Sequence, residues 1–189
     1  MINDLFDKQS TLQKQGLEVI KNLEIEKILS VYGEFKLVGS IVYGLMTWRD
    51  IDMDLRLDND PTDLTYWEIV QSLFKKSGVN LLTLADNRKQ REKDRPKSMY
   101  IGIKYEDKDK NIWKIDIRIL GKEFVTTDKV AELIKKATTE QRQLILFIKS
   151  QVHNDPKYHK DFSSLDIYEA VIINNITTLQ EFKDYLKNK

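Results

Sequence analysis

The segment from Asp50 to Leu57 constrains the fold more than any other part of the sequence. It alternates strictly, with Asp, Asp, Asp and Arg at the even positions and Ile, Met, Leu and Leu at the odd positions. A period of two is the repeat of a β-strand, in which successive side chains point to opposite faces. We therefore expect a strand that buries one face and presents a row of carboxylates on the other.

The remaining patterns predict a mixture of helices and strands. Apolar residues recur at helical spacing over residues 2–30, with a break expected at either Gln15-Gly16 or Asn22-Leu23. Further strands are predicted at 35–39, 80–85, 98–105 and 112–120, the last two forming a hairpin. Further helices are predicted at about 63–77, 128–137, 139–152, 164–174 and 178–187.

These elements predict an α/β (α+β) fold, with a mixed or antiparallel sheet flanked by helices and a C-terminal helical bundle. We expect a catalytic domain over residues 1–121 and a helical region over 122–189. At 189 residues the chain is close to the size of one domain, or of a small domain with an appendage.

Composition excludes several classes of protein. The formal net charge is only +1, so the bulk basic field that grips duplex nucleic acid is absent, and nucleic acid is not an expected partner. No apolar run is long enough to span a membrane, and the first ten residues lack the pattern of a signal peptide. We therefore expect a cytoplasmic protein.

The composition also limits which kinds of metal site the chain can form. The absence of Cys excludes thiolate zinc sites and Cys nucleophiles, and two His residues leave little scope for a His-based site. A metal would have to be held by carboxylates, which favours an ion such as Mg²⁺ that prefers oxygen ligands.

One group of residues carries this chemistry. Asp50 and Asp52 lie two positions apart on a strand and so share a face, where two carboxylates repel unless a cation lies between them. Asp116 lies among isoleucines on a later strand and can complete a site for one or two Mg²⁺ ions. Gly39 and Ser40 end a strand and offer backbone N–H groups and a hydroxyl to phosphate oxygens. Metal ligands beside a phosphate cradle indicate phosphoryl or nucleotidyl transfer.

The same residues resemble the motifs of a known enzyme superfamily. Residues 35–57 and 111–120 are similar to the nucleotidyltransferases that include DNA polymerase beta, poly(A) polymerases and the aminoglycoside nucleotidyltransferases. The family pattern is Gly-Ser or Gly-Gly, a short spacer, Asp-x-Asp or Asp-x-Glu with apolar flanks, and a third acid on a later strand. Its counterparts here are Gly39, Ser40, Asp50, Asp52 and Asp116.

This resemblance implies a role for each residue of the pattern. Gly39 and Ser40 would hold the β- and γ-phosphates of a nucleoside triphosphate, and Asp50 and Asp52 would bind metal. Asp116 would bind one metal and help to deprotonate the attacking hydroxyl. The implied reaction is a Mg²⁺-dependent in-line attack on the α-phosphorus with pyrophosphate as the leaving group, and a two-ion site is expected.

Two alternatives concern the acidic residues. The alternation extends to Asp54, so the metal-binding pair could be shifted to Asp52 and Asp54. The spacing from Gly-Ser and the flanking residues favour the earlier pair, and we expect Asp54 to pair with a Lys or an Arg. Asp116 is flanked by Lys114 and Arg118 and could belong to a surface ion pair, although the rest of the motif favours catalysis.

Other candidates are less constrained by the motif. Arg49 precedes the acidic pair and could contact phosphate or pair with an acid, whereas Lys149 is a candidate triphosphate ligand because relatives carry such a Lys in their helical part. The alternative for Lys149 is a side chain that snorkels at a helix edge. Tyr158 and Tyr168 could stack on a base or lie in the core, and the basic loop 87–97 could grip an anionic acceptor.

The small size and near-neutral charge predict a nucleoside triphosphate and a small hydroxylated, antibiotic-like molecule as substrates. The first alternative is transfer to a macromolecule, either a tRNA or a partner protein as in toxin–antitoxin systems. The second is a non-catalytic nucleotide-binding protein, which the presence of all three acids disfavours.

Overall fold

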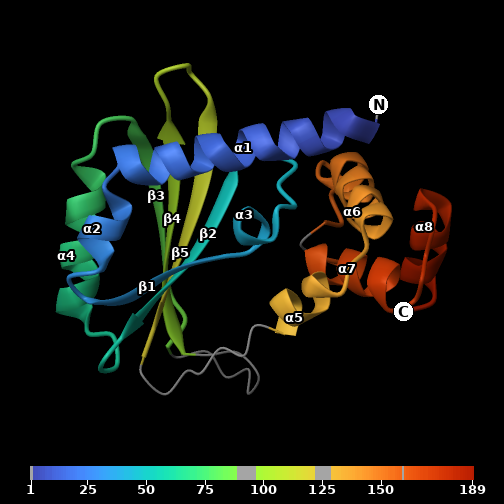
Figure 1. Ribbon diagram of the computed structural model, residues 1–189. Helices are drawn as coiled ribbons and strands as arrows, with labels where there is room; N and C mark the ends of the chain where they lie inside the picture. The colour runs from blue at the N-terminus through green and yellow to red at the C-terminus, as the bar shows by residue number, and fades with distance from the viewer. Residues whose placement is uncertain (1, 89–96, 122–128, 159) are drawn as a thin grey trace. The chain divides into compact units, whose positions relative to one another are not determined.

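The computed structural model describes residues 2–88, 97–121, 129–158 and 160–189 (Figure 1). Its five strands are β1 (Gly33–Val38), β2 (Asp50–Leu57), β3 (Val79–Asp86), β4 (Ser98–Glu106) and β5 (Ile112–Leu120). The helices in the first 75 residues are α1 (Ile2–Asn22), α2 (Ile25–Leu29), α3 (Ser40–Tyr43) and α4 (Asp63–Phe74). The helices of the C-terminal part are α5 (Lys129–Lys135), α6 (Thr139–Val152), α7 (Ser164–Ile172) and α8 (Leu179–Lys187).

The five strands form one mixed sheet in the order β1-β2-β5-β4-β3. The β2–β5 pair is parallel, and the β1–β2, β4–β5 and β3–β4 pairs are antiparallel. Together with the flanking helices this confirms the α/β fold expected from the sequence. The parallel pair is the feature that matters for the site, because it places β2 beside a strand that follows it by about 60 residues in the sequence.

The described chain divides into two compact units. One contains the sheet and consists of Leu12–Val42 and Trp48–Thr126. The other is helical and consists of Met1–Thr11, Tyr43–Thr47 and Thr127–Lys189. A domain boundary after residue 121 stays a prediction. Among the described helices, none combines the length and the apolar character that a membrane span requires.

The alternation along β2 and β5 decides which face of the sheet is buried. Six aliphatic side chains at alternating positions of the two strands are almost completely inaccessible to solvent: Ile51, Met53, Leu55, Ile115, Ile117 and Ile119. Helix α1 packs on this face, where Gly16 lies close to the side chains of Ile51 and Trp113. Each buried aliphatic side chain contributes about 1.5–3 kcal/mol, so the register of both strands is strongly fixed and the polar residues take the other face.

Most element boundaries follow the sequence patterns, with local differences. The first helical segment breaks at residues 23–24, which confirms the Asn22-Leu23 alternative, and Glu24 adopts the left-handed conformation there. Strand β1 begins at Gly33, two residues before the predicted strand at 35–39, and ends at Val38. Thr62 caps α4 by accepting a hydrogen bond from the N–H of Thr65. Helix α4 ends at Phe74, before the predicted residue 77.

The turn between β4 and β5 is organised by the carboxylate of Asp107. Its Oδ1 accepts hydrogen bonds from the N–H groups of Asp109 and Asn111, and its Oδ2 accepts one from Nε1 of Trp113 at 3.0 Å. Partial burial alone would raise the pKa of Asp107, but the bonds from Trp113 and Asn111 outweigh it and lower the pKa. The charged carboxylate therefore stabilises the hairpin that positions β5.

We expect Asp107→Ala to lower the free energy of unfolding by about 1.5–3 kcal/mol at pH 7, because it removes hydrogen bonds to a charged acceptor. Since folding lowers the pKa of Asp107, this contribution is present above the unfolded pKa of about 3.9 and is lost as the pH falls through the folded value. Urea unfolding at pH 7 and pH 3 measures both effects. Asp109→Ala, in the same turn, is the control, and an equal loss in both variants would contradict the assignment.

Candidate active site

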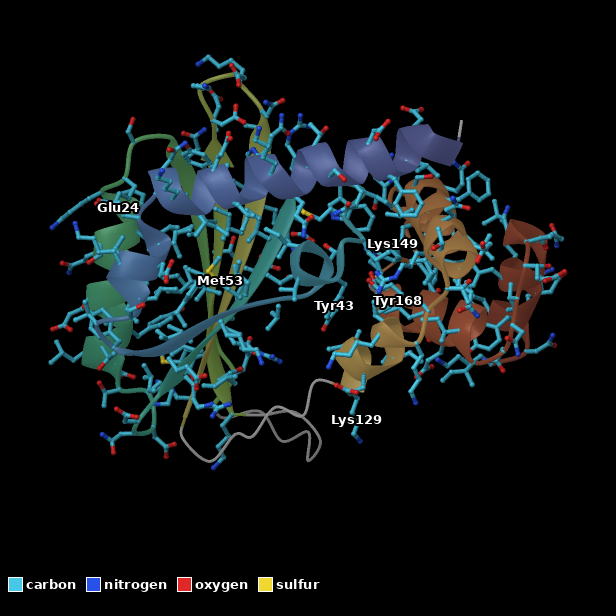
Figure 2. The ribbon with its side chains drawn as sticks, in the orientation of Figure 1. Glu24, Tyr43, Met53, Lys129, Lys149 and Tyr168 are labelled. Atoms are coloured by element: carbon cyan, nitrogen blue, oxygen red, sulfur yellow. The ribbon has the colours of Figure 1, made fainter. Side chains whose placement is uncertain are left out.

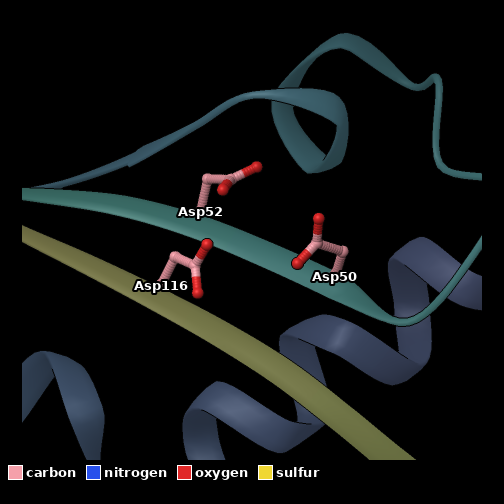
Figure 3. Close-up of side chains that lie close together, drawn as sticks. All are labelled: Asp50, Asp52 and Asp116. Carbon is pink, nitrogen blue, oxygen red and sulfur yellow. The ribbon is translucent and has the colours of Figure 1, made fainter. Parts of the chain in front are cut away.

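Three aspartates from two adjacent strands converge on the polar face of the sheet. Asp50 and Asp52 lie on β2 and Asp116 lies on β5, and one ligand oxygen from each falls within 4.8 Å of the others (Figure 3). Asp50 is buried, whereas Asp52 and Asp116 are half-buried. The structure thus brings together the three acids that the sequence singled out.

The register of the parallel pair explains why these carboxylates meet. Across β2 and β5, Asp50 lies opposite Lys114 and Asp52 lies opposite Asp116. Like charges directly opposite each other on a sheet are destabilising, so the Asp52–Asp116 pair requires positive charge nearby. A cation bound between these two carboxylates would relieve their repulsion.

Lys114 supplies positive charge to this cluster. Its Nζ donates to Oδ2 of Asp116 at 2.6 Å and to Oδ1 of Asp50 at 3.2 Å. Burial alone would lower the pKa of Lys114, but the two carboxylates outweigh it and raise the pKa, so the side chain stays an ammonium. Asp116 is therefore in an ion pair, as one alternative held, and lies within the acidic cluster at the same time.

Hydrogen-bond donors orient two of the carboxylates. Nε1 of Trp48 donates to Oδ2 of Asp50 at 3.2 Å, and the hydroxyl of Tyr100 donates to Oδ1 of Asp116 at 2.8 Å. Burial, and after it the bond to Asp116, raises the pKa of Tyr100 well above its ordinary value, so the phenol remains a donor. A Cβ at Gly102 would collide with the Tyr100 hydroxyl, so the glycine makes room for this bond.

The Gly39 turn lies directly against the cluster. Val38, the last residue of β1, is the register partner of Asp52, and Gly39 follows with φ +73°. A Cβ at Gly39 would lie 2.6 Å from Oδ2 of Asp52, so only glycine fits here without moving the carboxylate. Ser40 begins the short helix α3 immediately after this turn.

Asp54 has a different environment from the other two acids of β2. Arg118 lies opposite it and donates from Nε and Nη2 to its two carboxylate oxygens, at 2.9 and 2.7 Å. This bidentate pair confirms the expected pairing of Asp54 with a Lys or an Arg. Its carboxylate is committed to Arg118 on the same face.

The structure does not bring Arg49 to the acidic cluster. Its guanidinium lies over the ring of Trp113, 5.9 Å from the ring centroid. Trp113 alternates with Lys114 along β5 and is buried on the apolar face, whereas Asp116 lies on the polar face. The Nε atom of Arg49 is buried and has no hydrogen-bond partner among the described residues. A nucleotide contact for Arg49 stays a prediction.

Lys149 belongs to the helical unit and is buried, with 1% exposure, instead of snorkelling at a helix edge. Its Nζ donates to the carbonyl of Leu45 at 2.7 Å and lies 3.4 Å from the hydroxyl of Tyr168 (Figure 2). Tyr158 and Tyr168 are both buried in this unit. A triphosphate contact for Lys149 stays a prediction, and most of the basic loop, residues 89–96, lies outside the described residues.

The three-aspartate cluster suits a divalent ion with oxygen ligands. Octahedral Mg²⁺ holds its ligands at about 2.0–2.1 Å, so opposite ligand oxygens lie about 4.2 Å apart. At least two of the three oxygen pairs would then be neighbouring ligands, about 2.9 Å apart. The oxygens, which lie within 4.8 Å of one another, would therefore move closer together to share one ion. Asp50, Asp52 and Asp116 could hold Mg²⁺, and Lys114 binds one oxygen of Asp50 and one of Asp116.

The arrangement of helices and strands is similar to that of several solved structures. A MgGTP-bound Cid1 poly(U) polymerase matches with a TM-score of 0.60 and 13% identity, over 90% of this chain and 54% of that chain. A Cid1 structure described for its RNA terminal uridylyl transferase activity matches with a TM-score of 0.62 and 14% identity, over 93% and 52%. CdnC from E. coli MS115-1 with ATP matches with a TM-score of 0.53 and 14% identity, over 96% and 65%.

The chain shares the fold of the Cid1 and CdnC structures. This confirms, at the level of the fold, the resemblance carried by residues 35–57 and 111–120. The likeness in fold comes with only 13–14% sequence identity. No family model and no curated protein matches the sequence. The chain spans about half the length of the Cid1 chains and less than two thirds of CdnC.

We expect Gly39→Ala to displace the Asp52 carboxylate and so to weaken the binding of a divalent ion to this nucleotidyltransferase fold. Gly44→Ala is a matched control, because Gly44 also has a positive φ but a Cβ there meets only Gln9 at 3.6 Å. Both variants should lose about 1–2 kcal/mol of stability from the left-handed backbone. Urea unfolding and Mn²⁺ titration separate the two effects, and equal Mn²⁺ affinity in both variants would contradict this role for Gly39.

Proposed function

We propose that the chain is a Mg²⁺-dependent nucleotidyltransferase that moves a nucleoside monophosphate from a nucleoside triphosphate to a hydroxyl group. The observation that carries the proposal is the convergence of Asp50, Asp52 and Asp116 beside the Gly39 turn. A row of carboxylates alone is common on protein surfaces. Here the sheet places Asp52 opposite Asp116. This arrangement lowers stability because the two carboxylates repel each other, and a bound divalent cation would remove that repulsion.

The proposed reaction follows from the positions of these residues. The acceptor oxygen forms a bond to the α-phosphorus, and the bond from that phosphorus to the oxygen bridging to the β-phosphate breaks, releasing pyrophosphate. Asp116 accepts or directs the proton that leaves the acceptor hydroxyl. Gly39 and Ser40 bind the β- and γ-phosphates through backbone N–H groups and the serine hydroxyl.

Bound Mg²⁺, with two ions in our proposal, would supply Lewis-acid activation of the acceptor and charge neutralisation of the leaving group. The chain's own residues hold the reacting groups in place. Trp48 and Tyr100 fix the carboxylates of Asp50 and Asp116, so that their oxygens point to a common centre. Orientation of this kind supplies much of the rate enhancement in phosphoryl transfer.

We propose a small hydroxylated molecule as the acceptor, in agreement with the net charge of only +1. The second candidate is the 3′ hydroxyl of an RNA. It is favoured by the similarity in fold to Cid1, which is described as a poly(U) polymerase with RNA terminal uridylyl transferase activity. Both candidates use the same transfer chemistry and differ only in what presents the hydroxyl.

The metal assignment predicts that Asp50→Asn, Asp52→Asn and Asp116→Asn each lower turnover by at least about 100-fold, since each removes a charged metal ligand from the reacting centre. Pyrophosphate release from each of the four nucleoside triphosphates, with Mg²⁺ and a panel of acceptors, measures this. Asp54→Asn is the matched control, because it makes the same change on the same strand and face. We expect Asp54→Asn to lower stability while retaining most of the turnover.

Retention of activity in Asp52→Asn, or an equal loss in Asp54→Asn, would contradict the assignment. Urea unfolding of each variant shows whether a loss of turnover reflects loss of the folded chain. We expect Asp52→Asn to be at least as stable as the wild type without metal, because it relieves the repulsion from Asp116.

Salt dependence separates the two acceptors. An RNA held by three phosphate contacts should lose about tenfold or more in affinity between about 50 and 200 mM salt, because bound counterions are released. A small neutral acceptor should change little over the same range. The measurement is the KM for each acceptor as a function of KCl concentration. A steep slope with RNA and no turnover with small acceptors would overturn the first candidate.

A further inference from the structure

The polar face of the β2–β5 pair contains three facing pairs of charged residues, and they are not equivalent. Asp54 faces Arg118 and Asp50 faces Lys114, whereas Asp52 faces Asp116. Two positions therefore join opposite charges, and the position between them joins two carboxylates. Lys114 forms ion pairs both with Asp50, which lies opposite it, and with Asp116, which belongs to the neighbouring pair of carboxylates.

The contacts of Lys114 differ from those of Arg118, and the difference decides how easily each side chain can leave its carboxylate partners. Arg118 donates two parallel hydrogen bonds to the carboxylate of Asp54, a geometry that fixes both partners. Lys114 instead bridges two carboxylates with one ammonium group, at 3.2 and 2.6 Å, and its side chain is 53% exposed. The ammonium can therefore turn into solvent about its own side-chain bonds, with no change in the backbone of β5.

We propose that Lys114 is an exchangeable counter-cation that a divalent metal must displace from Asp50 and Asp116. This inference rests on the proposed function and adds a positioning residue to it. While Lys114 bridges the carboxylates of Asp50 and Asp116 it stabilises the sheet, and it competes with a metal for these two carboxylates. Breaking this bridge costs free energy, and this cost makes the binding of a divalent metal ion to the cluster weaker.

Displacement of Lys114 also couples metal binding to nucleotide binding. An ammonium released from the two aspartates remains beside the site and gains a new anionic partner when a triphosphate enters. Metal and nucleoside triphosphate then each favour the binding of the other, because coupling between two ligands is reciprocal. The free protein is expected to bind the metal weakly and the nucleotide-loaded protein to bind it tightly.

Calorimetric titration of Mn²⁺ into the nucleotide-free chain tests this directly. Lys114→Gln removes the charge and should bind Mn²⁺ roughly tenfold more tightly, which corresponds to about 1.4 kcal/mol. Lys114→Arg keeps the charge and should stay close to the wild type. Lys104→Gln is the matched control, because Lys104 is the register partner of Lys114 on β4 and has the same charge on the same face. It makes no ion pair among the described residues, so its effect should be less than about twofold.

A second measurement distinguishes exchange from a purely structural role. Without metal, in EDTA, Lys114→Gln should have a lower Tm than the wild type, because Asp50 and Asp116 lose their counter-charge. Saturating Mn²⁺ should then raise the Tm of Lys114→Gln by more than it raises that of the wild type. A side chain that only supports the fold would lower both Tm values and leave the Mn²⁺ affinity unchanged.

Three outcomes would overturn the inference: unchanged affinity in Lys114→Gln, weaker affinity in Lys114→Gln, or an equal gain in Lys104→Gln. Including the Asp52→Asn variant in the Mn²⁺ titration distinguishes failure of this inference from failure of the proposed function. If the wild type binds Mn²⁺ and Asp52→Asn does not, the metal site stands whatever Lys114 does. If neither the wild type nor Lys114→Gln binds Mn²⁺, both the metal site and the inference are wrong.

Discussion

The repulsion between Asp52 and Asp116, opposite each other on parallel strands, is the constraint on which the site depends. A sheet normally places opposite or neutral side chains at such positions, as it does at Asp54 and Arg118. Here the hydrophobic faces of β2 and β5 fix the register, so the two carboxylates cannot slide apart. Buried isoleucines thus hold in place a pair of charges that needs a cation, and Lys114 contacts one member of that pair, Asp116.

Two glycines make this arrangement sterically feasible. Gly39 leaves space for the Asp52 carboxylate at the end of β1, and Gly102 leaves space for the Tyr100 hydroxyl on β4. In both cases a strand loses a side chain so that an oxygen of the site can occupy its place. In the helical unit, the ammonium group of the buried Lys149 also has polar partners: it donates to the carbonyl of Leu45 and lies beside the hydroxyl of Tyr168.

Much of the site could be predicted because it depends on alternation within single strands. The period of two placed the acids of β2 on one face, and Asp116 was recognised as a lone acid among the isoleucines of a later alternating strand. The roles of Lys114 and Tyr100 depend on pairing between strands, which alternation alone does not fix. The hairpin offered an unused signal, because pairing around a turn at residues 107–111 sets Gly102 opposite Asp116. Lys149 was missed as a core residue because burial of a Lys depends on tertiary partners.

The parallel pairing of β2 with β5 also has a consequence for synthesis of the chain. The partners Asp50 and Lys114 are 64 positions apart, so β2 leaves the ribosome well before the strand that neutralises it. Until then its row of carboxylates faces water and repels other acidic segments, which disfavours premature association with a neighbouring nascent chain. The charges that we assign to chemistry in the finished protein would thus also protect an unfinished one.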